Sequence, residues 1–260
     1  MNEVNSENTS TAWPTDVLTL SIDVGGSGVK ASVLNPSGDM MVERVRVDTP
    51  YPCPPERLVS TIVELTKDLP ATHRVSVGFP GMVRAGRVID VPSLTRPTYD
   101  GQRDPELAAL WQGFDLGTVL AQVLNKPTKV VNDADMQGCA VVQGTGMEFV
   151  LTLGTGVGTA LFHDGTLLPH LEISHGPFRD GQSFDIALGN SERKSIGKPA
   201  WRKRVAAAIV DFDDMFYFDH VYVGGGNAKH LEPEDIGAKG QIVSNSAGII
   251  GGVRIWELEG

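Results

Sequence analysis

Short apolar segments separated by glycine and proline turns dominate the start of the chain. An apolar run at 17–24 is followed by the turn GGSG at 25–28, and further apolar runs at 29–34 and 40–47 flank the turn NPSG. Such runs bounded by turn residues are typical of β-strands. The pattern therefore predicts an antiparallel three-stranded meander over residues 17–47.

A helical spacing of apolar residues follows a proline-rich segment, YPCPP. Leu58, Ile62, Leu65 and Leu69 recur every three or four residues, which predicts a helix over 55–69. Residues 84–113 hold turn residues and prolines and are predicted to be a long loop with a short helix at its end. By the same reasoning we expect further helices at 105–111, 114–125, 134–144 and 199–218, strands at 74–81, 126–135 and 220–226, and a closing strand, turn and helix within 241–258. Strands alternate with helices from residue 74 onward, so the predicted fold class is α/β.

The strand, glycine turn and strand pattern returns over residues 149–168. When Gly156 is aligned with Gly26, the next turn glycines, Gly38 and Gly165, fall within three residues of register. This weak internal repeat predicts two hairpins, each folded about a glycine-rich turn. Two such units facing each other would bring two backbone loops to one cleft.

Length and composition agree with a globular protein and exclude several classes. The 260 residues suffice for one large domain or two lobes, and no apolar run approaches the ~20 residues of a membrane span. The polar segment 1–16 lacks the pattern of a secretory signal and is predicted to be a disordered tail of a cytoplasmic protein. Cys53 and Cys139 form no CxxC pair, so we expect reduced thiols.

The net charge of −10 argues against nucleic acid as a partner, because phosphate backbones require a basic surface. It leaves room for a small phosphate ligand, which backbone N–H groups and a metal can hold. One basic cluster stands out, and it is either a solvated helix face or a groove for a polyanion. The cluster comprises Lys194, Lys198, Arg202, Lys203 and Arg204.

The glycine turns are candidates for binding phosphate. Glycine lets consecutive N–H groups face an anion, and a carboxylate such as Asp23 can hold Mg²⁺ directly or through water. The first turn fits neither a P-loop nor a dinucleotide motif, and a plain hairpin turn is the alternative interpretation for both turns. A third glycine run, at the end of the strand VYV, has the same two interpretations. The candidates are Asp23, Gly25, Gly26, Ser27, Gly28 and Lys30, then Gly154, Thr155 and Gly156, and then Gly224, Gly225 and Gly226.

Two further groups of polar residues are candidates for catalysis and for binding an acceptor. Asp133 follows the apolar run KVV, where strand ends of α/β proteins point into the ligand crevice, and it could accept a proton from a hydroxyl. The alternative is that Asn132 or Asp133 caps the following helix, and Asp135 is interpreted as a capping-turn residue. Glu172 and His175 suit hydrogen bonding to sugar hydroxyls better than metal binding, since no third ligand is evident, and the alternative is that they are surface polar residues.

In this order, the segments IDVGGSGVK, VGFPG, VVNDAD, LTLGTGVGTAL, an LxPxxExxH stretch and VYVGGG resemble the ROK family of sugar kinases, with the strongest likeness to its polyphosphate- or ATP-dependent glucokinases. The resemblance extends from about residue 17 to residue 252. It implies the actin-like (ribonuclease-H-like) ATPase fold, with lobes at 17–131 and 132–245 and the helix at 246–260 packing back on the first lobe. It also implies a homodimer.

The resemblance implies that Asp133 is the catalytic base for the 6-hydroxyl of a hexose. Asp23 with Mg²⁺ and the glycine turns would surround the phosphates of ATP or polyphosphate, and Gly224 to Gly226 would face that donor. The acceptor would contact Gly81, Ser93, Asn132, Glu172 and His175.

This sequence departs from the family around the sugar. It lacks the cysteine-rich zinc motif of many members, so no zinc is expected. Ser93 replaces a sugar-contacting asparagine, and PHLEISH replaces PNTELGH, which changes residues 170 and 174. We therefore expect phosphoryl transfer to be retained while glucose as the substrate is in doubt. The alternatives are a catalytically impaired sugar-binding or regulatory protein, and a kinase for another sugar or polyol.

Overall fold

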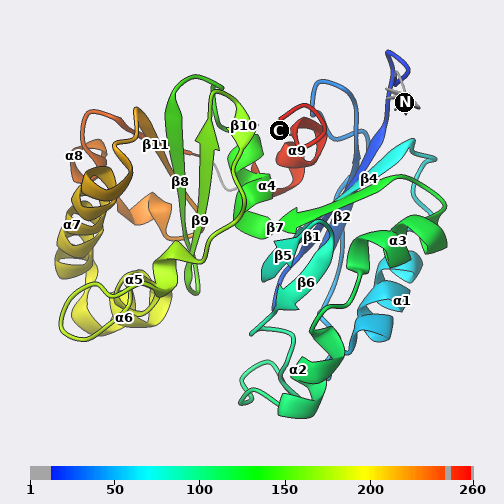
Figure 1. The fold of residues 1–260 in the computed structure, drawn as a ribbon, viewed down its shortest axis with the longest axis horizontal. Coiled ribbons are helices and arrows are strands. Elements are labelled where there is room, and N and C mark those ends of the chain that lie inside the picture. Colours follow the sequence, from blue (N-terminus) through cyan, green and yellow to red (C-terminus); the bar gives the residue numbers. More distant parts are fainter. Residues whose placement is uncertain (1–12, 244–246, 259–260) are drawn as a thin grey trace, which may run out of the picture.

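A computed structural model describes residues 13–243 and 247–258 (Figure 1). It contains two five-stranded sheets. The first has the order β3-β2-β1-β4-β7, and its strands are β1 (Thr19–Val24), β2 (Val29–Leu34), β3 (Val45–Val47), β4 (Arg74–Phe79) and β7 (Thr128–Asn132). The second has the order β10-β9-β8-β11-β12, and its strands are β8 (Met147–Leu153), β9 (Val157–His163), β10 (Thr166–Leu167), β11 (His220–Gly224) and β12 (Gly240–Ile242).

The two sheets have the same topology, which confirms the internal repeat. In each, three antiparallel strands come first in the chain, and two parallel strands are then added beside the first of them. The turn at 25–28 joins β1 to β2, and the turn at 154–156 joins β8 to β9 in the equivalent place. The two glycine turns therefore occupy matching positions in two copies of one unit.

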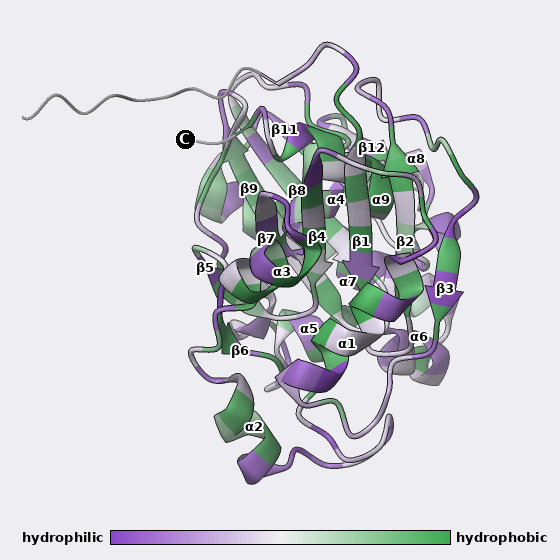
Figure 2. Cartoon of the chain, turned by 90° about the vertical axis from the view of Figure 1, so that its right-hand side faces the viewer, coloured by the Kyte–Doolittle hydropathy of each residue, from purple (hydrophilic) through white to green (hydrophobic). Residues whose placement is uncertain are grey.

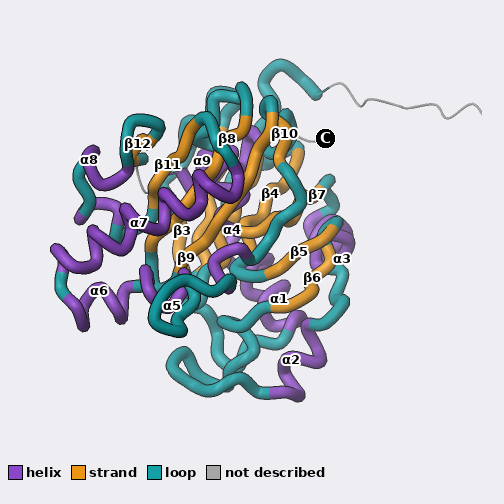
Figure 3. Tube along the Cα trace, turned by 60° about the vertical axis from the view of Figure 1, so that its left-hand side comes forward, coloured by secondary structure: helices purple, strands orange, loops and turns teal. Residues whose placement is uncertain are grey.

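Helices cover the outer face of each sheet. On the first sheet, α1 (Pro55–Thr66) and α3 (Leu116–Leu124) bury Leu58, Ile62 and Leu120 in a core shared with the strands. Figure 2 shows hydrophobic and hydrophilic residues alternating along α1, as expected for a helix with one buried face. On the second sheet, the long helix α7 (Lys198–Phe216) buries Trp201 and Phe212 against the strands (Figure 3). The shorter helices α5 (Phe184–Leu188), α6 (Asn190–Ile196) and α8 (Pro233–Ile236) adjoin α7.

Two helices lie between the sheets (Figure 1): α4 (Asp133–Cys139) and α9 (Ala247–Arg254). Strand β1 is tied to α9 by a hydrogen bond from Ser21 Oγ to the Ile249 carbonyl, 2.7 Å long. A Cβ at Gly251 would overlap the carbonyl oxygen of Met136, so the absence of a side chain allows α9 to lie directly on α4. Since α4 also packs against β9, these two helices join the halves of the molecule. The predicted lobe boundary at 131/132 remains a prediction.

The structure differs from the predicted elements in several places, and it contains the short helices α5, α6 and α8, which were not predicted. The predicted loop contains a hairpin, β5 (Met82–Arg84) and β6 (Arg87–Asp90), besides the expected α2 (Pro105–Trp111). These two strands are too short for an alternation of apolar and polar residues to be recognised in the sequence. Trp13, assigned to the disordered tail, lies edge-on to Trp256, with ring centroids 5.5 Å apart. Residues 1–12 of that tail lie outside the described residues. The third strand of the meander is only three residues long, because polar residues interrupt the run before it.

No helix in the described ranges is long and apolar enough to cross a membrane.

Candidate active site

One cleft of about 470 Å³ gathers residues from both halves of the chain. Its wall contains both glycine turns, the start of α4, and the segment that follows β10. Of the residues singled out in the sequence, those that line it are Gly25, Gly26, Gly81, Ser93, Asn132, Asp133, Gly154, Thr155, Gly156, Glu172, His175, Gly225 and Gly226. Segments that are distant in sequence thus converge at the place where the internal repeat predicts a cleft.

The first glycine turn has its carbonyl groups held by the protein. The Gly25 carbonyl accepts a hydrogen bond from Thr49 Oγ1 at 2.6 Å, the Gly26 carbonyl from the Tyr51 hydroxyl at 2.8 Å, and the Ser27 carbonyl from Arg46 at 3.1 Å. Within the described residues, the N–H groups of Gly26 and Ser27 donate to no protein acceptor. A turn whose acceptors are occupied and whose donors are free is suited to an anion.

The second glycine turn repeats this arrangement. Asn227 Nδ2 donates to the Gly154 carbonyl at 2.8 Å, and the Asn190 N–H reaches the carbonyls of Gly154 and Thr155. The N–H groups of Thr155 and Gly156 have no protein acceptor in the described part of the chain. Each turn is closed by a bond from its first N–H to its last carbonyl, at 3.0 Å for Gly25 to Gly28 and 2.9 Å for Gly154 to Gly156. Both turns therefore offer backbone donors to the same space.

Asp133 is the first residue of α4, and its half-buried side chain lies in the wall of the cleft. Its Oδ1 accepts the N–H of Ala134 at 2.9 Å. Burial and the neighbouring charge of Asp23 raise the pKa of Asp133 to about 7, although the Ala134 N–H and His170 favour the carboxylate. A carboxyl group in this range can take up and release a proton near neutral pH.

The helix is capped by Asn132, one of the two alternatives considered for this segment. Asn132 Oδ1 accepts the N–H of Ala134 at 2.7 Å, and its Nδ2 donates to the carbonyl of Gly81 at 3.1 Å. The amide thus fixes the start of α4 and the turn at Gly81 together. The second hydrogen of Nδ2 remains for a ligand, because a side-chain amide carries two.

Asp135, interpreted as a capping-turn residue, lies in the first turn of α4, and its side chain also contacts a distant histidine. Its side chain is only 4% exposed and lies 2.9 Å from Nδ1 of His170, whose side chain is 3% exposed. Local sequence suggested a cap because the partner is 35 residues away. Burial opposes a charged imidazole, but Asp135 and Glu172 outweigh it and raise the pKa of His170 to about 9. The pair is therefore an imidazolium held by a carboxylate at neutral pH.

Glu172 lies between two histidines. Its Oε1 is 3.7 Å from Nε2 of His170, and its Oε2 is 3.8 Å from Nε2 of His175. The neighbouring His170 is the main cause that lowers the pKa of Glu172. Glu172 precedes a single 3₁₀ turn at Ile173–His175, so the two ends of the ExxH spacing meet without a regular α-helix.

Among the described residues, two buried polar atoms of the cleft lack a protein partner: Ser93 Oγ and His170 Nε2. Unpartnered buried polar groups are rare, because each costs roughly 1–3 kcal/mol. Their presence in one cleft indicates a polar ligand.

Several candidates do not line the cleft: Asp23, Ser27, Gly28, Lys30 and Gly224. Asp23 and Lys30 form an ion pair of 2.9 Å on adjacent strands behind the first turn.

The described residues contain no group of three His, Cys, Asp or Glu side chains that could hold a metal ion. A cation there would depend on few protein ligands. Mg²⁺ tolerates this because it keeps several waters and binds phosphate oxygens, and a cation beside Asp23 would relieve its repulsion with Asp133.

Sequence analysis missed Asp185 and Arg96, which both line the cleft. Asp185 Oδ1 accepts the N–H of Val157 at 2.7 Å and closes the second glycine turn from the side. No local motif marked either residue. Asp185 lies in the first turn of the short helix α5, and its role becomes visible only through its contact with the distant Val157.

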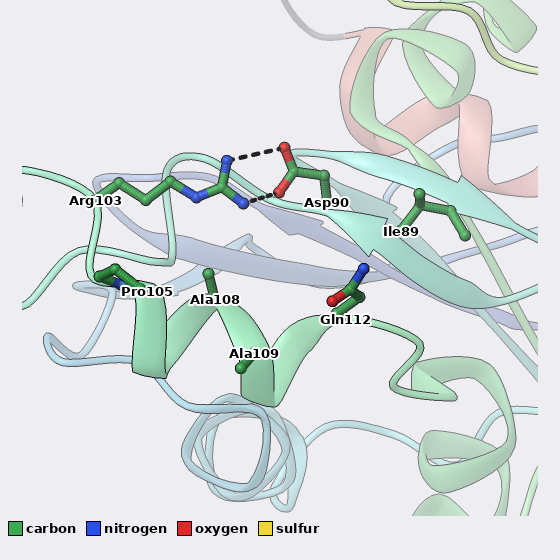
Figure 4. A pocket seen from close by; sticks show the side chains of 7 residues that line it. All are labelled: Ile89, Asp90, Arg103, Pro105, Ala108, Ala109 and Gln112. Carbon is green, nitrogen blue, oxygen red and sulfur yellow. Dashed lines mark hydrogen bonds and ion pairs between the residues drawn. The ribbon is translucent and has the colours of Figure 1, made fainter.

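A second hollow, of about 500 Å³, lies between β6 and α2 (Figure 4). Arg103 and Asp90 face each other across it and form a two-point ion pair. Most of the other lining side chains are apolar or small. Since its charged groups satisfy each other, this hollow offers no free group for chemistry.

Comparison with known proteins supports a common origin. A model of the ROK family matches residues 19–170. The polyphosphate glucokinase of Mycobacterium tuberculosis is 26% identical over 220 residues, which cover 81% of this chain and 78% of the relative.

Solved structures agree with this relationship and with the fold. The inorganic polyphosphate/ATP-glucomannokinase from Arthrobacter sp. strain KM superimposes with a TM-score of 0.75 at 27% identity, covering 92% of this chain and 97% of that one. A ROK family glucokinase from Streptomyces griseus, solved with glucose and AMPPNP, has a TM-score of 0.72 at 17% identity, covering 92% and 98%. The predicted actin-like ATPase fold is confirmed.

Proposed function

This chain belongs to the ROK family, and from that membership we propose that it is a sugar kinase that transfers a phosphoryl group from ATP or inorganic polyphosphate to the 6-hydroxyl of a hexose. The relatives are sugar kinases, which are phosphotransferases with an alcohol acceptor. Glucose or a close relative of glucose is the acceptor that we propose.

The observation that carries the proposal is the position of Asp133. Its carboxyl group shares the cleft wall with Gly26 of the first glycine turn and with Thr155 and Gly156 of the second. A base and two sets of free backbone N–H groups are what phosphoryl transfer to an alcohol requires, since this chemistry depends on positioning and charge stabilisation.

We propose the following roles in the reaction. Asp133 accepts the proton of the sugar hydroxyl while its oxygen attacks the terminal phosphorus of the donor. A P–O bond to this oxygen forms, the bond from that phosphorus to the donor's bridging oxygen breaks, and the shortened donor leaves with the electron pair. The N–H groups of the two turns stabilise the negative charge on the transferred phosphoryl group.

Mg²⁺ would be held by the donor's phosphates, with Asp23 contributing directly or through water. When bound, it would supply charge neutralisation of the phosphate oxygens. The ion pair of Asp23 with Lys30 leaves Oδ1 of this carboxylate available. Lys30 in turn holds the Asp23 side chain beside the turn.

The acceptor is proposed to contact Ser93, Glu172 and His175, with Asn132 and Gly81 beside them. The unpartnered Ser93 Oγ supports this placement. Because Ser93 and residue 170 differ from the family pattern, we propose a hexose whose hydroxyls suit these two side chains.

The test is a coupled assay across a panel of hexoses, amino sugars and polyols, each with ATP and with polyphosphate. We expect turnover with at least one sugar, and Asp133→Asn should reduce kcat by roughly 10²- to 10⁴-fold while sugar and donor still bind in calorimetry. Binding of a sugar without turnover in the wild-type protein would instead identify a sugar-binding protein of the same fold.

A further inference from the structure

The segment that follows β10 contains a buried histidine for which the fold alone gives no reason. The side chain of His170 is 3% exposed, yet it lines the cleft, and Nδ1 is bound to Asp135 at 2.9 Å. Asp135 is on α4, two residues after the proposed base, and is itself 4% exposed. The imidazole is therefore fixed in orientation by a residue of the central helix.

The other ring nitrogen, Nε2, has no hydrogen-bond partner in the described part of the chain. Oε1 of Glu172 lies 3.7 Å from Nε2, a separation that exceeds that of a hydrogen bond. With Nδ1 facing a carboxylate and the pKa of the ring raised to about 9, Nε2 carries a hydrogen. A buried donor and a carboxylate acceptor thus lie side by side at the cleft, too far apart to satisfy each other.

We propose that His170 is a specificity-determining residue of this enzyme, and that Nε2 of His170 and Oε1 of Glu172 together bind one hydroxyl of the acceptor sugar. This inference rests on the proposed function, because it names a contact in the same site. The hydroxyl oxygen accepts the hydrogen of Nε2, and the hydroxyl hydrogen is donated to Oε1.

The chemistry of the two groups selects a hydroxyl over other substituents. A hydroxyl is both donor and acceptor, whereas a carbonyl or carboxylate would repel Glu172 and an ammonium group would repel the charged imidazole. An oxygen can lie ~2.8 Å from both atoms when these are 3.7 Å apart. A deoxy position would leave both groups desolvated and unpaired, which is the situation in which a site discriminates most strongly.

Asp135 acts as a positioning residue in this arrangement. It does not line the cleft, and its contact is with Nδ1, the nitrogen that faces away from the proposed hydroxyl. Holding Nδ1 fixes the ring and keeps the hydrogen on Nε2. Residues 135 and 170 therefore form one unit, contributed by the central helix and by the segment after β10.

The experiment combines variants of residue 170 with monodeoxy analogues of the best sugar found for the wild-type protein. His170→Asn keeps a donor near the position of Nδ1 and removes the one at Nε2, whereas His170→Gln can reach the position of Nε2. We expect His170→Asn to raise the KM and the Kd of the sugar roughly 10- to 100-fold, with little change in the KM of the donor and partial recovery in His170→Gln.

The decisive readout is the coupling between residue and hydroxyl. In the wild-type protein, one deoxy analogue should lose roughly 10- to 100-fold in kcat/KM relative to the parent sugar, and in His170→Asn this same analogue should lose almost nothing further. His163→Asn, an exposed histidine of β9, is the matched control and should behave as wild type. Thermal melts verify that each variant is folded.

The outcomes separate the two proposals. If the wild-type protein phosphorylates a sugar but every deoxy analogue loses the same factor in wild type and in folded His170→Asn, the inference about His170 is wrong and the kinase proposal stands. If the wild-type protein binds and phosphorylates no sugar with either donor, the proposed function is wrong and the inference falls with it.

Discussion

Charged groups in and behind the wall of the cleft influence one another through a partly buried environment. Asp133 is close enough to Asp23, Asp135 and His170 for each to affect its proton affinity. The two carboxylates disfavour ionisation of Asp133, and the imidazolium favours it. Its readiness to accept a proton therefore depends on three residues from three different segments.

These shifts predict an acid limb in the pH profile of the proposed kinase. The base must be ionised, and its pKa is raised to about 7, so kcat/KM for the sugar should rise with pH and level off above about 7. Asp23→Asn removes a negative neighbour and should move the limb to lower pH, whereas His170→Asn removes a positive one and should move it to higher pH. Initial rates between pH 5 and 9 test this, and a flat profile over that range would contradict it.

At the residue scale, local chemistry identified the positions whose partners are near in sequence. Asp133 follows a buried strand, and the glycine turns are visible as turns, so their meeting in one cleft was predictable. The contact of Asp135 with His170 was not predictable from the local sequence, because the two residues are distant in the chain. Asp185 was missed for the same reason, since it acts on the turn after Leu153 from a segment about thirty residues away.

Among the elements, the glycines serve two separate purposes, which a pair of substitutions should distinguish. At Gly26, a Cβ would meet only ordinary contacts, the closest being Ser93 Cβ at 3.5 Å, whereas at Gly251 it would collide with the Met136 carbonyl. Gly26→Ala should leave stability within about 0.5 kcal/mol and raise the KM of the donor. Gly251→Ala should lower the free energy of unfolding by about 1–3 kcal/mol, despite the better helix propensity of alanine. Urea unfolding measures the stability of both variants, and steady-state kinetics measure the KM of the donor. Equal losses of stability in Gly26→Ala and Gly251→Ala would contradict the distinction.

The basic residues that cluster in the sequence have different surroundings in the structure. Arg202 is 2.6 Å from Asp235, and Arg204 is 2.7 Å from Glu192, so both charges are paired. Lys198 and Lys203 line a hollow of about 430 Å³ together with Lys229 and His230, next to the turn that follows β11, and Arg202, Glu232 and Asp235 belong to the same wall. The hollow keeps an excess of basic side chains on an otherwise acidic protein.

We expect the hollow to matter for a long polyanionic donor. Replacing Lys198, Lys203 and Lys229 by Gln together should raise the KM of polyphosphate severalfold more than that of ATP, because electrostatic attraction grows with the number of phosphates contacted. Lys67→Gln, on the opposite lobe, is the control. Equal changes for both donors would show that these lysines are a solvated surface.

Most helices and strands were predictable because their apolar periods are long enough to recognise. Helices α1, α3 and α7 and the central strands fall where the periodicity predicts them. The hairpin β5–β6 and the helices α5, α6 and α8 were not predicted. They span three to seven residues each, and their formation depends on contacts such as the cap of Ser183 on Ile186 and the capping box at Glu232.

For the whole molecule, two separate cores are joined by a third. One core surrounds the first sheet and contains Trp111, another surrounds the second sheet and contains Trp201, and a third lies around Met136, Phe162 and Ile255 between the sheets. The strand order repeats in both halves, but α4 and α9 belong to the interface. The halves are therefore coupled through these two helices.

This coupling predicts one unfolding transition. In variants that retain only Trp111 or only Trp201, fluorescence should report the same melting temperature, because neither sheet keeps its inner face covered when α4 and α9 detach. In Gly251→Ala, which loosens that interface, the two signals should separate by several degrees. Two distinct transitions in the wild-type background would contradict the coupling.

A position that tolerates no side chain should be as conserved in evolution as a position that takes part in catalysis. Gly251 lies on α9, whose described residues do not line the cleft, yet any replacement there would push α9 away from α4. In an alignment of orthologues, or in a selection of randomised genes for growth on a sugar, it should be as invariant as Asp133. An invariant position near the end of this protein would therefore reflect close packing between two helices. Only a measurement of stability and of turnover in the same variant can distinguish this packing constraint from a catalytic role.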